Sequence, residues 1–130
     1  MKKAGTDIPK MRPISEAWVL ENTLEHQTIE GSMLYSPQYS DHEFVYRHIT
    51  VPRKIIRKAK ELLVSYGRKN NDGPSYHGLQ VSARRANEPL LPYEDVVTQL
   101  YIHMSSDWML YLIHERDCTL CFRRPRRDGH

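Results

Sequence analysis

Residues 36–55, SPQYSDHEFVYRHITVPRKI, contain the change from strand to helix on which the predicted fold depends. Within them the run EFVYRHI (43–49) is predicted as a strand, because aromatic and β-branched residues dominate it. Successive side chains of a strand point to opposite faces. One face would carry Phe44, Tyr46 and His48, and the other Val45, Arg47 and Ile49. Both faces are bulky, so we expect one to be covered and the other to be used for binding.

A helix is predicted directly after this strand, over PRKIIRKAKELLVSY (52–66). Its apolar residues recur at intervals of three and four, with basic residues on the other side. Pro52 suits the first helical position, where no N–H donor is needed, and Gly67 suits the end. This is the strongest helix signal in the chain.

The second half of the chain predicts one more helix and two more strands. The helix starts near Pro92, has acidic residues in its first turn, and its apolar stripe is Val96, Val97, Leu100, Tyr101 and Met104. The strands are WMLYLIH (108–114) and CTLCFRR (118–124), joined by ERD. With an earlier strand from Met33, the order of elements predicts an α+β fold with an antiparallel sheet.

The length of 130 residues fits one domain with a tail or a long loop. We assign residues 1–32 to a partly disordered N-terminal extension. Ser15 and the apolar spacing after it also suggest a short acidic helix over about 13–30, although a loosely docked extension is preferred. Residues 67–91 are rich in turn-forming residues and predict a long loop with little core value. Residues 126–130 form a basic tail.

Charge is segregated along the chain. The net value of +3 arises from 19 basic and 16 acidic residues. Residues 13–46 hold six acidic residues and no Lys or Arg, whereas residues 47–60 hold six basic residues and no acid. A diffuse nucleic-acid binder does not need this separation, whereas a protein with separate faces for separate partners would use it. The sequence also lacks a long apolar run and the apolar core of a secretory signal, so we expect no membrane span and no secretion.

The chemistry-bearing residues do not form a catalytic motif. Seven histidines are scattered without metal-ligand spacing, so we expect no enzyme, no metal and no cofactor. Cys118 and Cys121 have the C-x-x-C spacing of zinc or redox sites, but no second ligand pair accompanies them. We interpret them as ordinary strand thiols. Asp41 and Glu43 flank a turn and are expected to be solvated.

Several arginines with a tryptophan and a serine suggest an oxyanion site. Planar guanidinium groups hold phosphate well when hydroxyl or amide donors lie beside them. Ser105 is predicted at the end of the second helix, three residues before Trp108, so both can face one pocket. Arg47 projects from the strand quoted above, and Arg123 and Arg124 end the last strand. Spacing alone does not show that they converge, and a solvated surface is the alternative.

Two stretches resemble the cyclin-dependent kinase regulatory subunit (CKS) family. One is SPQYSDHEFVYRHITVPRKI (36–55), and the other is SSDWMLYLIHERDCTLCFRRP (105–125). The resemblance covers about residues 33–66 and 92–125, in the right order. It identifies residues 33–125 as a CKS-like domain in which 67–91 is a loop insertion.

The resemblance implies a four-stranded antiparallel β-sheet with two α-helices between the strand pairs. It implies a non-catalytic adaptor of cell-cycle control, in the cytoplasm and nucleus. Such an adaptor binds the C-terminal lobe of a cyclin-dependent kinase and docks phosphorylated Thr-Pro proteins in a cationic pocket. Carried over by position, the phosphate-binding residues are Arg47, Ser105, Trp108 and Arg124. The kinase-binding residues are Tyr39, Tyr111, Leu112, Ile113, His114 and Glu115.

Some positions depart from the family pattern. Gln38 stands where the family has a base, which predicts weaker phosphate binding by the two remaining arginines. Residues 114–118, HERDC, replace the family's hinge and lack both of its prolines. Those prolines tension the hinge and allow the last strand to swap between two chains. We therefore expect a plain hairpin and a monomer rather than a strand-swapped dimer.

Two alternative functions fit parts of the sequence. A small nucleic-acid-binding domain would use the bases of residues 47–60 and the C-terminal RRPRR (123–127). We do not expect it, because the aromatic residues lie mainly on core-facing stripes rather than among the basic residues. The other alternative is a degenerate CKS-like fold that no longer binds kinase.

Overall fold

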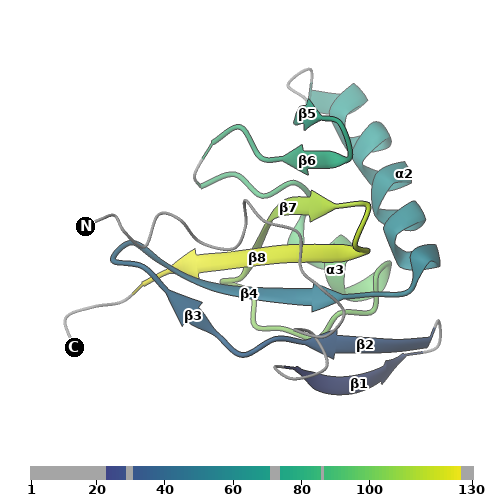
Figure 1. Cartoon of the computed structure of the whole chain (residues 1–130). Helices are drawn as coiled ribbons and strands as arrows, with labels where there is room; N and C mark the ends of the chain where they lie inside the picture. The colour runs from purple at the N-terminus through teal and green to yellow at the C-terminus, as the bar shows by residue number, and fades with distance from the viewer. Residues whose placement is uncertain (1–22, 29–30, 71–73, 86, 127–130) are drawn as a thin grey trace.

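The computed structural model describes residues 23–28, 31–70, 74–85 and 87–126, and Figure 1 shows how they are arranged. They form an antiparallel sheet with two helices, α2 (Arg53–Asn70) and α3 (Tyr93–Thr98). The strands are β1 (Leu24–Thr28), β2 (Gly31–Tyr35), β3 (Tyr39–Ser40), β4 (Phe44–Thr50), β5 (Ser75–His77), β6 (Gln80–Ser82), β7 (Met109–His114) and β8 (Thr119–Pro125). Neighbouring strands follow the order β1-β2-β4-β8-β7-β6-β5, and β3 pairs with β4 off this path. The predicted α+β class is confirmed.

The pairing of β4 with β8 forms the middle of the sheet, and its register runs from Phe44 opposite Pro125 to Thr50 opposite Thr119. The alternation predicted for β4 is present. Ile49 lies in the main core, whereas Tyr46 lies in a second cluster on the other face of the sheet. The two faces of the sheet therefore have different neighbours.

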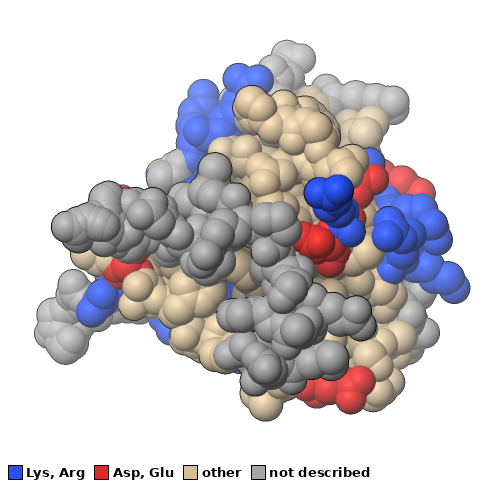
Figure 2. All heavy atoms as spheres, in the orientation of Figure 1, with Lys and Arg blue, Asp and Glu red and all other residues tan. Residues whose placement is uncertain are grey.

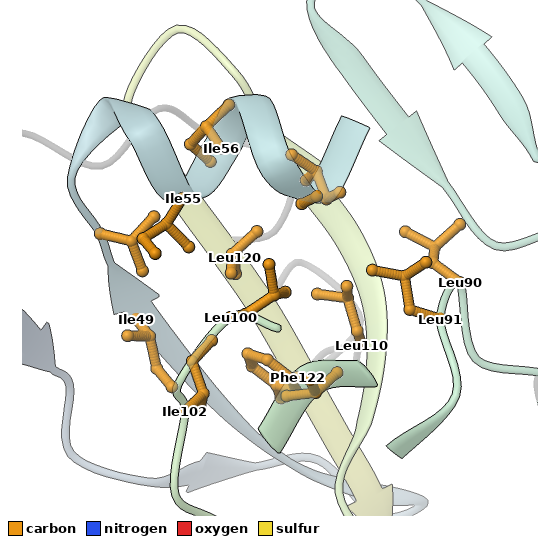
Figure 3. Packing of buried hydrophobic residues seen from close by; sticks show 14 of the residues in the cluster. Ile49, Ile55, Ile56, Leu90, Leu91, Leu100, Ile102, Leu110, Leu120 and Phe122 are labelled. Carbon is orange, nitrogen blue, oxygen red and sulfur yellow. The ribbon is translucent and has the colours of Figure 1, made fainter. Parts of the chain in front are cut away.

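Helix α2 covers the main-core face. Its stripe of Ile55, Ile56, Ala59 and Leu63 is buried, and Figure 3 shows Ile55 and Ile56 among residues of the sheet and of the α3 region. Burying each large aliphatic side chain contributes about 1.5–3 kcal/mol. The helix continues beyond the predicted end at Gly67 to Asn70, although a helical glycine costs about 1 kcal/mol relative to alanine. Neither described helix combines the length and apolar character that a membrane crossing needs.

The sheet has eight strands, so the prediction of four is wrong. Leu24–Thr28 forms β1 on the outer edge of β2, where a loosely docked extension was preferred and a short acidic helix was the alternative. Residues 13–22 and 29–30 of that segment lie outside the described residues. Strand β3 has only two residues. β5 and β6 form a hairpin around Gly78, whose φ of 61° suits glycine.

The segment 67–91 contributes to the core, contrary to the prediction. Val81, Leu90 and Leu91 are buried in the main cluster. The segment is held against β7, because β6 pairs with it and the N–H of Leu90 donates to the carbonyl oxygen of Leu110 at 2.7 Å. These contacts are with residues distant in the sequence, so local composition does not reveal them.

Helix α3 is short and ends at Thr98, well before Ser105. Val96 and Leu100 are buried, as predicted from their spacing. Tyr101 then takes a left-handed conformation with φ of 59°, which costs a residue other than glycine about 1–2 kcal/mol and stops a helical run. Ser105 consequently lies in the connection to β7. Its predicted position at the end of a helix is wrong.

Candidate functional site

Arg47 and Arg124 lie on the same face of adjacent strands. In the pairing of β4 with β8, Arg47 is opposite Phe122 and Val45 is opposite Arg124. The two arginines are therefore diagonal neighbours, a relation that places Cα atoms about 7–8 Å apart. The sheet register thus brings together two guanidinium groups that are far apart in the sequence.

Each guanidinium group is oriented by a ring and by an oxygen acceptor. Arg47 donates from Nε to the carbonyl oxygen of Ser36 at 2.8 Å, and its guanidinium lies 5.6 Å from the Tyr35 ring centre. Arg124 lies 4.9 Å from the Trp108 ring centre and donates from Nη2 to Oε1 of Gln38 at 3.4 Å. Stacking on an aromatic face and a fixed acceptor both restrict the long arginine side chain. The two cations are therefore held in place before any ligand binds.

Ser105 and Trp108 belong to one turn, although its position differs from the predicted one. The N–H of Trp108 donates to the carbonyl oxygen of Ser105 at 3.3 Å. The Ser105 hydroxyl donates to Oδ1 of Asp107 at 2.7 Å. The contacts of the described residues thus join Arg124 to Trp108 and Gln38, the strand register places Arg47 on the same face, and Ser105 is attached to Trp108 through the backbone of this turn. We call Arg47, Arg124, Trp108 and Gln38 the arginine pocket.

Arg123 does not belong to the arginine pocket, although the sequence had made it a candidate. It lies on the opposite face of β8, where its guanidinium is 4.6 Å from the Phe44 ring centre and 4.5 Å from that of Tyr111. The cause is the alternation of side chains along a strand. Arg126, assigned to the basic tail, donates from Nη1 to the carbonyl oxygen of Asp41 at 2.9 Å.

The second face of the sheet carries an aromatic cluster. Its buried members are Tyr46, Tyr111, Leu112 and Cys121, with Tyr39, Phe44 and Ala83 packed against them. The rings of Tyr39 and Tyr46 stack with centres 5.5 Å apart, and the Tyr39 hydroxyl hydrogen-bonds to Nε2 of His48. We call this set the aromatic face. Two sites of different chemistry therefore lie on opposite sides of the same strands.

A protein-family model described as cyclin-dependent kinase regulatory subunit matches residues 33–126. The chain belongs to this family. None of the curated proteins matches the chain. Membership of the CKS family makes the protein a regulatory subunit that binds cyclin-dependent kinases, from a family of non-catalytic adaptors.

The kinase-binding positions implied for this CKS member fall on two faces. Tyr39, Tyr111, Leu112 and His114 lie with the aromatic face or beside it, although the last three are only 4–6% exposed. Ile113 is fully buried in the main core, on the face of the sheet opposite the aromatic face. A β-bulge between Leu110 and Leu112 reverses the alternation, so that Tyr111 and Leu112 share one face and Ile113 turns to the other.

Glu115 connects the turn after β7 to helix α2. Its Oε1 lies 2.8 Å from Nζ of Lys60, and its N–H donates to the carbonyl oxygen of Leu79 at 2.9 Å. Both side chains of the ion pair are partly exposed, so the pair contributes only about 0–1 kcal/mol to stability. Glu115 is therefore held in place while one side of its carboxylate stays accessible.

Asp41 holds the turn before β4, although we predicted a solvated side chain at this position. Its carboxylate accepts the N–H groups of Glu43 and Phe44 at 2.8 and 2.7 Å, and the Tyr46 hydroxyl at 2.8 Å. Burial alone would raise the pKa of Asp41, but these hydrogen bonds lower it below its usual value. The turn signal between Ser40 and Phe44 pointed to this capping role, because Asp commonly accepts backbone N–H groups two or three residues on.

The two cysteines occupy different settings. Cys121 is fully buried on the aromatic face, and burial raises the pKa of its thiol, which favours the unreactive protonated form. Cys118 lies in the turn before β8 with φ of 51°. Within the described ranges, no group of three or more His, Cys, Asp or Glu side chains is placed to hold a metal ion.

His48 predicts a pH-dependent stability. Burial, with a smaller contribution from His114, lowers the pKa of His48 from 6.5 to about 4. His48 therefore becomes protonated near pH 6.5 in the unfolded chain, but only near pH 4 in the folded chain. As the pH falls from about 6.5 to about 4, the free energy of unfolding should therefore decrease by up to about 1.4 kcal/mol per pH unit.

Urea unfolding of the protein and of His48→Gln at several pH values between 7.5 and 4 measures this effect. The variant should lose this part of the slope, whereas the exposed His77→Gln should keep it. Equal slopes for the protein and His48→Gln would contradict the assignment.

Proposed function

We propose that this CKS-family protein is an adaptor that docks phosphothreonine-containing proteins onto a cyclin-dependent kinase in cell-cycle control. The phosphate binds between Arg47 and Arg124 and against Trp108, with Ser105 at the rim. The C-terminal lobe of the kinase binds at the aromatic face and at Glu115. The protein acts in the cytoplasm and the nucleus.

The convergence of Arg47 and Arg124 carries the phosphate part of this proposal. A phosphothreonine carries a charge of about −1.5 to −2 at neutral pH, which matches two guanidinium groups. The terminal nitrogens of Arg47 have no protein acceptor among the described residues, so they can donate to a ligand. Because both side chains are already oriented by Tyr35 and Trp108, binding loses less side-chain entropy.

A phosphothreonine-proline peptide is expected to bind with a dissociation constant in the micromolar to millimolar range, and the unphosphorylated peptide is not. Arg47→Ala and Arg124→Ala should each abolish binding, because one guanidinium alone leaves the phosphate charge half compensated. Isothermal titration calorimetry with the paired peptides measures this. Binding that does not distinguish the phosphorylated from the plain peptide would contradict the pocket.

Two controls separate the pocket from general charge effects. Arg116→Ala removes an exposed arginine from the β7–β8 turn, at the other end of these strands, and should leave the affinity unchanged. Gln38→Lys adds a cation beside Arg124 and should tighten binding by about five- to tenfold. Asn87→Lys makes the same charge change at an exposed residue and should have little effect.

Kinase binding should depend on Glu115 itself and not only on its ion pair with Lys60. Glu115→Gln is expected to lower co-purification with a cyclin-dependent kinase about fivefold, as the loss of one interfacial charge contact does. Lys60→Gln breaks the same ion pair but keeps the carboxylate, and it should retain the kinase. Equal losses in the two variants would show that Glu115 acts only by holding the turn.

We also propose that the protein is a monomer. The turn between β7 and β8 is closed within the chain by a hydrogen bond from the N–H of Cys118 to the carbonyl oxygen of Glu115 at 3.2 Å. β7 and β8 pair with each other on either side of this turn. Light scattering should give the mass of one chain, and a stable dimer would contradict this assignment.

A further inference from the structure

A basic groove lies between helix α2 and the connection that follows α3. It has a volume of about 320 Å³, and its polar lining consists of Lys54, Arg57, Lys58, Glu61, Gln99 and Tyr101. A second groove of about 280 Å³ is lined by Gln27, Thr28, Tyr101 and His103. Tyr101 lines both, so the two grooves meet at this side chain.

Tyr101 is placed at this junction by its backbone. Its left-handed conformation, with φ of 59°, lets the next residue, Ile102, enter the core with no exposed surface. The tyrosine itself stays partly exposed between α2 and β1. The Tyr101 side chain therefore lies between the two grooves, and the buried Ile102 next to it holds this part of the backbone against the core.

A row of ring contacts links the second groove to Arg47. The rings of His103 and His26 have centres 5.5 Å apart, and those of His26 and Tyr35 lie 5.7 Å apart. The Tyr35 ring in turn supports the guanidinium of Arg47. A contiguous line of side chains thus runs from Arg47 to Tyr101 and on to the basic groove.

The basic groove carries a net positive charge, with three cations and the one carboxylate of Glu61 in its lining. Lys54, Arg57 and Lys58 are exposed, and Lys54 lies three and four positions before the adjacent Arg57 and Lys58, so that all three line the groove from α2. None of the three forms an ion pair with an acid in the described part of the chain, whereas Lys60 is paired with Glu115. Figure 2 shows Lys and Arg side chains gathered over α2. An anionic ligand would therefore meet free cations here.

We propose that the basic groove binds an acidic segment of the same phosphorylated protein whose phosphothreonine occupies the arginine pocket. This inference rests on the proposed function and adds a second specificity element to it. Measured along the rest of β4 and the first turns of α2, Arg47 and the basic groove are separated by on the order of 20 Å, or about six extended residues. Two weak sites joined by one chain bind more tightly than either alone.

A protein segment suits this groove better than nucleic acid. Glu61 lies in the lining beside the three cations, and a continuous row of phosphates would meet this carboxylate. A peptide can place one or two acidic side chains against Lys54, Arg57 and Lys58 and a neutral residue beside Glu61. Tyr101 and Gln99 on the other wall supply a ring and an amide that peptides commonly contact.

The test compares two phosphothreonine-proline peptides by calorimetry in low and moderate salt. One carries two glutamates separated from the phosphothreonine by spacers of about four to ten residues, and the other carries glutamines there. At the best spacer the acidic peptide should bind about tenfold more tightly, and the gain should shrink as salt rises. Arg57→Gln should reduce the gain to about threefold or less, whereas Arg116→Gln, a matched loss of one exposed arginine, should keep it.

The outcomes separate this inference from the proposed function. Equal affinities for the two peptides, or equal effects of Arg57→Gln and Arg116→Gln, would overturn the proposal that the basic groove binds an acidic segment, while leaving phosphothreonine docking intact. If neither phosphorylated peptide binds, the proposed function fails and the joint site fails with it. A mixed-sequence DNA duplex that competes more strongly than the acidic peptide, in an Arg57-dependent way, would overturn the peptide assignment in favour of nucleic acid.

Discussion

The antiparallel pairing of β4 with β8 is the interaction on which the rest of this structure depends. It joins two strands that lie far apart in the sequence, with a register that places Val45 opposite Arg124 and Ile49 opposite Leu120. Because side chains alternate along a strand, a slip of one residue would exchange the two faces of β8. Such a slip would bury Arg124 against the wrong face and expose Leu120. The apolar side of the pairing, packed under α2, therefore keeps the arginines together.

Much of this arrangement follows from local pattern, because the hydrophobic period of a long segment is enough to predict whether it forms a helix or a strand. The alternation in residues 43–49 and the apolar stripe of α2 predicted both elements correctly, and their burial is as expected. The short strands could not be predicted in this way. β5 and β6 have three residues each, and β6 is ordered by its pairing with β7 rather than by its own composition. β1 likewise depends on its pairing with β2, and nothing in its own sequence predicted a strand.

The candidate site was partly predictable for the same reason. Arg47, Trp108 and Arg124 follow from the resemblance, and the register brings Arg47 and Arg124 to one face, with the Arg124 guanidinium over the Trp108 ring. Ile113 was named from the resemblance by position, and the bulge in β7, whose extra residue no local signal marks, turns its side chain to the main core. Ser105 was misplaced because α3 ends at Thr98 and the left-handed conformation of Tyr101 keeps the chain from resuming a helix, and tyrosine gives no warning of such a conformation.

Gln38 changes how the arginine pocket works rather than only weakening it. A base at this position would add charge, but it would also repel Arg124 when no ligand is bound. Gln38 instead accepts a hydrogen bond from Arg124, while Trp108 supports the other side of the guanidinium. The pocket therefore has less charge and more order, and orientation contributes to anion binding by lowering the entropy lost on association. With only two cations in the arginine pocket, additional affinity has to come from contacts elsewhere on the ligand, and in our proposal Lys54, Arg57 and Lys58 of the basic groove provide them.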